Sequence, residues 1–205
     1  MINFVIPSIA RNTLSYTIQS LLDQTDPDWE CWVGFDGIEE GKIEEDKLIK
    51  DERVHYIYFP EKLGESQHHG NAGLVRNAII SKIQNNRPWI GFVDDDDMLS
   101  KYYVEVARLE SEYKEFDACV FRMRYDIQNS KIIPPFDVDS IVQNNVGISF
   151  FANRKFLQNN NIEFVNDNAE DFRFLKSIED NGGKVHISFH VMYNVNGYNY
   201  CEFQL

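Results

Sequence analysis

The sequence is poor in cysteine, in basic side chains and in long apolar segments, and each shortage excludes a class of protein. Its three cysteines, Cys31, Cys119 and Cys201, lie far apart and form no CxxC pair. We therefore expect neither a disulfide framework nor a structural zinc site, and we expect a reducing, cytoplasmic environment. No apolar run is long enough to span a bilayer, and the residues after Met1 do not resemble a signal peptide.

Positive charge is also scarce. Lysine and arginine together number 20 against 33 aspartates and glutamates, which gives a formal net charge of -13. A surface this acidic repels nucleic acid and anionic membranes, so we expect neither as a partner. A substrate that carries phosphate would need a metal ion or a few well-placed cations in its site.

Material for a core is abundant, since 43% of the 205 residues are hydrophobic and 14% are aromatic. This length suits one packed domain over residues 1–205, and we find neither a repeat nor a linker. In the first half, predicted strands alternate with helices, which is typical of an α/β domain with a mainly parallel sheet. The strands are predicted at 2–7, 29–35, 54–59 and 89–93, and the helices at 14–22 and 74–84.

The second half has a different pattern. Residues 118–125 and 130–133 predict an antiparallel pair, and further strands are predicted at 146–152 and 184–193. Short helices are predicted at 154–160 and 171–180. We therefore expect a three-layer α/β domain whose C-terminal half adds mixed strands to the central sheet.

Four consecutive aspartates, Asp94 to Asp97, directly follow the apolar run 89–93. Two like charges about 4 Å apart repel by about 1 kcal/mol in water, and a divalent cation such as Mg²⁺ or Mn²⁺ would relieve that repulsion. Ligands of α/β sheets bind outside the carboxyl ends of the strands, which predicts that Pro7, Ser8 and Asp36 lie near this run. The alternative is a solvated turn that caps a helix beginning near Leu99.

Six short motifs follow one another along nearly the whole chain. They are 4–8 (FVIPS), 35–37 (FDG), 73–77 (GLVRN), 94–97 (DDDD), 153–154 (NR) and 170–182, which opens with Glu-Asp and ends in Gly. This series resembles the GT-A fold (Rossmann-like) of nucleotide-sugar glycosyltransferases, in particular family 2. The segment 73–77 is one residue shorter than the family spacing, and Asp36 stands alone where the family often has two aspartates.

The resemblance implies a metal-dependent glycosyltransferase of the hexosyltransferase type. It would move a sugar from a nucleotide donor, a UDP-sugar by preference, to a hydroxyl acceptor such as a glycan. Residues 1–100 would form the donor half and 101–205 the acceptor half. In the acidic run, Asp94 would lie near the ribose, Asp96 would bind Mn²⁺ or Mg²⁺, Asp95 would lie close to both, and Asp97 would cap the next helix.

Other donor contacts follow from the same resemblance. Asp36 would accept a hydrogen bond from the base, although an aspartate before glycine is also a common turn residue. Pro7 and Ser8 would approach the base or ribose through their backbone. Arg76 would bind the base or the phosphates because its fork matches oxyanions, and the alternative is an ordinary exposed helix arginine.

Asp171 is the candidate general base, since it begins a half-buried helix whose N-terminus would face the cleft. It could instead be a helix N-cap. Glu170 and Gly147 are assigned to the acceptor side. Asn196 stands where many relatives carry a late histidine that helps to hold the metal, so the third protein ligand stays open.

Two other functions fit parts of the sequence. A sugar nucleotidyltransferase also uses carboxylate-bound metal, but it usually has a glycine-rich basic loop after the first strand, and residues 9–12 contain no glycine. A catalytically silent module would bind nucleotide or sugar without turnover. Assays of transfer and of UDP binding distinguish the three.

Overall fold

The computed structural model describes residues 1–63, 72–126, 131–166 and 169–197. Its strands form one nine-stranded sheet in the order β3-β2-β1-β4-β8-β6-β9-β5, with β7 paired to β6. The strands are β1 Ile2–Ser8, β2 Trp29–Asp36, β3 Val54–Phe59, β4 Trp89–Phe92, β5 Met98–Leu99, β6 Ala118–Asp126, β7 Lys131–Ile133, β8 Phe150–Asn153 and β9 Val185–Asn194. The helices are α1 Leu14–Leu22, α2 Ala72–Lys82, α3 Tyr103–Tyr113, α4 Arg154–Asn160 and α5 Glu170–Asp180, with a 3₁₀ turn at Glu45–Lys47.

The first half of the chain forms a parallel sheet, as its sequence predicts. β1 pairs in parallel with both β2 and β4, and β2 pairs in parallel with β3. The carboxyl ends of these four strands therefore meet at one edge. The loops after β1, β2 and β4, which carry the predicted donor residues, leave the sheet there.

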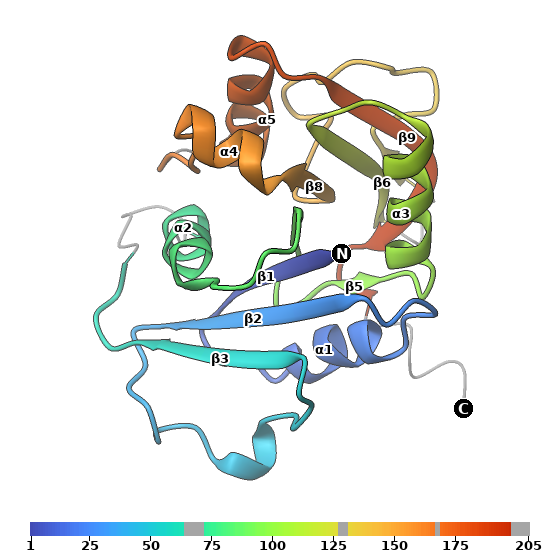
Figure 1. Cartoon of the computed structure of the whole chain (residues 1–205). Coiled ribbons are helices and arrows are strands. Elements are labelled where there is room, and N and C mark those ends of the chain that lie inside the picture. The colour runs from blue at the N-terminus through green and yellow to red at the C-terminus, as the bar shows by residue number, and fades with distance from the viewer. Residues whose placement is uncertain (64–71, 127–130, 167–168, 198–205) are drawn as a thin grey trace.

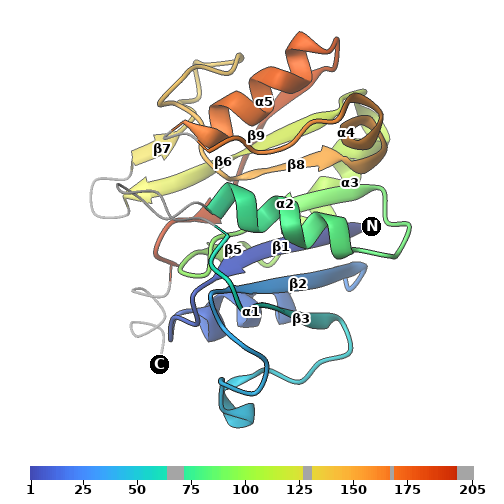
Figure 2. The ribbon, with the colours of Figure 1, turned by 90° about the vertical axis from the view of Figure 1, so that its left-hand side faces the viewer.

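The second half adds mixed strands, which confirms the predicted fold class. β8 is antiparallel to both β4 and β6, whereas β6 and β9 are parallel. The short strand β5 pairs with β9 at the far end, so the sheet curls into a half-barrel. Helices α2, α4 and α5 lie on one side of the sheet and α1 and α3 on the other, giving three layers (Figures 1 and 2).

Aromatic side chains fill both faces of the sheet. Adjacent residues of a strand point to opposite faces of the sheet. Phe150 and Phe151 of β8 are both fully buried, which shows that both faces are covered there. The Phe150 ring lies 5.5 Å from that of Phe174 on α5, whereas the Phe151 ring lies 6.4 Å from that of Tyr103 on α3. Strand β8 thus anchors one helix on each side.

Two details differ from the sequence prediction. No helix begins near Leu99; Met98 and Leu99 form β5, and α3 begins at Tyr103 with Tyr102 as its N-cap. Asp97 is therefore not a helix cap, because its carboxylate accepts hydrogen bonds from elements that the sequence places far away. In addition, β8 begins at Phe150 and is shorter than the predicted strand 146–152.

The described helices are too short and too polar to cross a membrane.

Candidate active site

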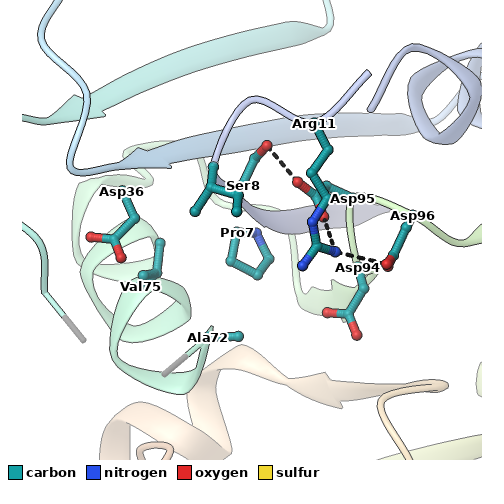
Figure 3. A pocket seen from close by; sticks show the side chains of 10 residues that line it. Pro7, Ser8, Arg11, Asp36, Ala72, Val75, Asp94, Asp95 and Asp96 are labelled. Carbon is teal, nitrogen blue, oxygen red and sulfur yellow. Dashed lines mark hydrogen bonds and ion pairs between the residues drawn. The ribbon is translucent and has the colours of Figure 1, made fainter. Parts of the chain in front are cut away.

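A cavity of about 320 Å³ opens at the carboxyl ends of β1, β2 and β4 (Figure 3). It is lined by Pro7, Ser8, Ile9, Arg11, Asp36, Ala72, Val75, Asp94, Asp95 and Asp96. The structure thus brings together the predicted donor residues of three separate loops and the predicted metal ligand. Arg76 is the one predicted donor residue that is not among the lining residues.

Asp95 is the buried member of the acidic run. Its Oδ2 accepts a hydrogen bond from the Ser8 hydroxyl at 2.7 Å, and its Oδ1 accepts one from Arg11 Nη1 at 3.1 Å. Burial raises the pKa of Asp95, and the charges of Asp96 and Asp94 add to this, whereas Ser8 and Arg11 oppose it. The same Ser8 hydroxyl accepts the N–H of Ala10, so the loop after β1 is fixed to the end of β4.

Asp96 is more accessible. Its side chain is 32% exposed, and its Oδ2 accepts a hydrogen bond from Arg11 Nη1 at 2.7 Å. One guanidinium nitrogen therefore lies between the carboxylates of Asp95 and Asp96, as Figure 3 shows. Arg11 was not among the sequence candidates, although it follows Ser8 by only three positions.

Arg76 is a buried bridge between three elements, so the interpretation as an exposed helix arginine is wrong. From α2, its Nη2 donates to Asp94 after β4, and its Nη1 donates to Glu170 of α5 at 2.5 Å. The other oxygen of Glu170 accepts the Gly73 N–H at 3.1 Å. Burial lowers the pKa of Arg76, but Asp94, Asp171 and Glu170 outweigh this, and the net pKa is raised.

Glu170, predicted on the acceptor side, therefore faces Arg76 and the start of α2. A Cβ at Gly73 would lie 2.6 Å from the Glu170 carboxylate, so only glycine allows this approach. Glu170 thus links the second half of the chain to the first.

Asp171 lies next to this bridge and is half-buried, with its Oδ1 shielded from solvent. Its Oδ1 has no hydrogen-bond partner among the residues that the structure describes. Burial raises its pKa to about 7; the positive charge of Arg76 opposes this, and the charges of Asp94 and Glu170 add to it. The N-cap of α5 is Ala169, so the alternative that Asp171 is the cap is wrong.

Gly147 and Asp171 are neighbours in space. A Cβ added to Gly147 would lie 3.9 Å from Asp171 Oδ2 and 2.8 Å from the Met123 side chain. The absence of a side chain at position 147 therefore leaves room beside the Asp171 carboxylate.

Asp36 lies on the side of the cavity away from the acidic run, with Pro7 between them in the view of Figure 3. Its Oδ1 accepts the N–H of Leu63 at 2.8 Å. This hydrogen bond orients the carboxylate, and among the described residues no hydrogen bond to its second oxygen is present.

Asp97 is held by the last strand. Its Oδ2 accepts a hydrogen bond from the Tyr193 hydroxyl and its Oδ1 accepts the Asn196 N–H, both at 2.7 Å. Burial raises its pKa to about 8, the charge of Asp94 adds to this, and the two hydrogen bonds oppose it. No sequence signal marks Tyr193, which looks like an ordinary core residue at the end of a strand.

The family profile described as Glycosyl transferase family 2 matches residues 4–168. The chain belongs to this family. The predicted resemblance to GT-A enzymes of family 2 is thereby confirmed, and the match covers the donor cavity and most of the mixed strands.

One curated protein and several solved structures are similar to this chain. The Bacillus subtilis (strain 168) protein named "Putative teichuronic acid biosynthesis glycosyltransferase TuaG" is 29% identical over 110 residues, which are 51% of this chain and 39% of that protein. The structure of S. aureus TarS residues 1–349 has a TM-score of 0.71 at 17% identity and covers 98% of this chain and 63% of that one. The complex of TarS 1–349 with UDP-GlcNAc has a TM-score of 0.71 at 17% identity, covering 95% and 58%. This chain thus spans less than two thirds of the length of each of these proteins.

The arrangement of carboxylates restricts how this family 2 chain could hold a metal ion. Within the described residues, no group of three or more histidine, cysteine, aspartate or glutamate side chains is placed to bind one. Mg²⁺ commonly needs only one or two carboxylates when substrate phosphates and water complete its shell. Asp95 and Asp96 fit that pattern, because a single cationic nitrogen of Arg11 already lies between them.

Proposed function

We propose that this chain is the donor-binding and catalytic part of a glycosyltransferase that moves a sugar from a UDP-sugar to a hydroxyl of a glycan or similar acceptor. Family membership and the structures of TarS 1–349 with UDP and with UDP-GlcNAc support a nucleotide-sugar donor. The observation that carries the proposal is the Asp171 carboxylate beside the donor cavity, whose shielded Oδ1 has no hydrogen-bond partner among the described residues and whose pKa is raised to about 7.

The donor would occupy the 320 Å³ cavity. The second oxygen of Asp36 would accept the N–H of uracil, and the backbone of Pro7 and Ser8 would contact the base or ribose. Asp94, held by Arg76, would accept a hydrogen bond from the ribose. Arg76 would then act by orienting Asp94 and Glu170, since its two terminal nitrogens already donate to these carboxylates.

Asp96, with Asp95, would hold Mn²⁺ or Mg²⁺ together with the diphosphate. A cation bound there would act as a Lewis acid that neutralises the departing diphosphate. Asp95 is fixed by Ser8, so the carboxylate pair is oriented before ligand binding. Pre-organisation of this kind limits the reorganisation needed during the reaction.

Asp171 would act as general base. Its carboxylate would take the proton of the acceptor hydroxyl while that oxygen bonds to the anomeric carbon and the bond to the diphosphate breaks. A group with a pKa of about 7 is half deprotonated at neutral pH and is strong enough to accept a proton. Gly147 would give the acceptor access to Asp171 because it has no side chain.

Calorimetric titration of UDP with and without Mn²⁺, followed by an assay of UDP release from UDP-sugars, tests this proposal. We expect UDP to bind only weakly without Mn²⁺ and UDP-sugars to be turned over with it. A chain that binds no uridine nucleotide would overturn the proposal. Binding without turnover on any acceptor would favour a silent module, and synthesis of UDP-sugar from UTP and a sugar 1-phosphate would favour a nucleotidyltransferase.

A further inference from the structure

Arg11 occupies the position between the two carboxylates that would hold a cation. Its Nη1 lies 3.1 Å from Asp95 Oδ1 and 2.7 Å from Asp96 Oδ2. The Arg11 side chain is 47% exposed, whereas that of Asp95 is 6% exposed. The arginine therefore approaches the buried Asp95 and the more accessible Asp96 from the solvent side.

Arg11 and a divalent ion on these two oxygens would repel each other, so they compete for the carboxylate pair. Ser8 donates to Asp95 Oδ2, and Oδ1 is the oxygen that faces the cationic Arg11 nitrogen. A divalent ion bound to Asp95 Oδ1 and Asp96 Oδ2 would take the place of Nη1. The contact between Arg11 and Asp96 is exposed, and exposed ion pairs contribute little stability, so a doubly charged ion can displace Arg11.

Arg11 is also the basic residue of the donor cavity. Among the described residues that line the cavity it is the single cation, and four of the others are aspartates. A diphosphate entering a chain with a formal charge of -13 needs positive charge close by. The guanidinium fork binds phosphate oxygens in pairs, so an arginine released from Asp95 and Asp96 can serve this purpose.

We propose that Arg11 is a displaceable counter-ion: it neutralises Asp95 and Asp96 when the donor is absent, gives up these carboxylates to the divalent cation, and then binds the donor diphosphate. This inference rests on the proposed function. Before the metal ion binds, the Arg11 side chain pairs with Asp95 and Asp96. After the metal ion binds, it pairs with the donor diphosphate.

The test compares Arg11→Gln with Arg108→Gln. Arg108 of α3 is a matched control, because its side chain is 46% exposed and pairs with the buried Asp26, away from the cavity. Calorimetry with MnCl₂ alone should show about three- to tenfold tighter Mn²⁺ binding to Arg11→Gln than to the parent, because a competing cation is gone. With saturating Mn²⁺, UDP should bind about tenfold more weakly to Arg11→Gln. Arg108→Gln should match the parent in both titrations.

Each outcome decides one point. Mn²⁺ binding that is unchanged or weaker in Arg11→Gln would overturn the role as counter-ion, and unchanged UDP affinity would overturn the role at the diphosphate. If the parent protein itself bound neither Mn²⁺ nor UDP, the proposed function would fail as well. Arg11→Lys keeps the charge without the fork, so we expect parent-like Mn²⁺ affinity with weakened UDP binding.

Discussion

The hydroxyl of Tyr193 donates a hydrogen bond of 2.7 Å to Asp97, a residue 96 positions earlier in the chain. The same hydroxyl accepts the backbone N–H of Asp94 at 3.1 Å. One side chain of the last strand therefore holds both ends of the acidic run. The position of these aspartates relative to the cavity depends on β9 as well as on β4.

We expect Tyr193→Phe to destabilise the protein by about 1–3 kcal/mol, because the buried Oδ2 of Asp97 and the N–H of Asp94 both lose the hydrogen bond to this hydroxyl. UDP affinity should fall as well, because Asp94 is released. Urea denaturation and calorimetry measure the two effects. Tyr113→Phe is the control, since Tyr113 is 80% exposed. Equal stability of the two variants would contradict the role given to this hydroxyl.

Asp171→Asn should lower the rate of sugar transfer by at least about 100-fold and leave UDP affinity within about twofold of the parent, because an amide cannot accept the acceptor proton. Asp180→Asn on the same helix is the control, since the Asp180 side chain is 62% exposed and pairs with Lys176. Steady-state kinetics and UDP titration check both variants. Near-normal transfer by Asp171→Asn would rule out its role as base.

Activity and stability should respond to pH in opposite directions through Asp171. The pKa of Asp171 is about 7 in the folded protein and 3.8 for an ordinary, solvent-exposed aspartate, so the native state binds a proton that the unfolded state has lost. Its contribution to stability is complete below about pH 4 and is lost as the pH rises to about 7. Activity should rise over the upper part of this range, as the base is deprotonated. The difference in unfolding free energy between the parent and Asp171→Asn should therefore change between pH 4 and 7; a constant difference would contradict the raised pKa.

Arg76→Gln should cost about 3–5 kcal/mol of stability, since it leaves Asp94 and Glu170 without their buried partner. Arg76→Lys keeps the charge and should be less destabilising. Arg76 also lowers the pKa of Asp171, so the pH–rate profile of Arg76→Gln should shift to higher pH. Thermal unfolding and a pH series measure these effects. A loss of stability without any shift of the pH profile would restrict Arg76 to a structural role.

Asp96→Asn should abolish the increase in melting temperature that we expect from Mn²⁺ and UDP together, because a ligand that binds only the native state stabilises it. Asp46→Asn, at an exposed position outside the donor cavity, should keep the increase. Thermal scans with Mn²⁺, with UDP and with both compare the variants. An unchanged increase in Asp96→Asn would assign the metal to other residues.

The sequence predicts the parallel half of the fold well because local patterns determine it. The apolar runs of β1 to β4 end at polar loops, and the rule that strand ends meet at one edge places Asp36 near the acidic run. The strand β5 could not be predicted, since Met98 and Leu99 become a strand only by pairing with Asn194 and Tyr193.

The same limit applies to the site. Four identical aspartates do not reveal which of them is buried, and the structure separates Asp95, bonded to Ser8, from the accessible Asp96. Arg76 looks like a surface residue of a helix until Glu170, 94 positions later, is brought against it. Partners this distant leave no periodic signal in the sequence.

The order of strands in the sheet interleaves the two halves of the chain. β4 lies beside β8, and β5 is completed by β9, so strands made before residue 100 are neighbours of strands made after residue 149. During synthesis, we expect the cavity at the ends of β1, β2 and β4 to reach its final form only after β9, which holds Asp97, has left the ribosome. A protein cut between the halves would lose its binding site, even though every lining residue lies in the first piece.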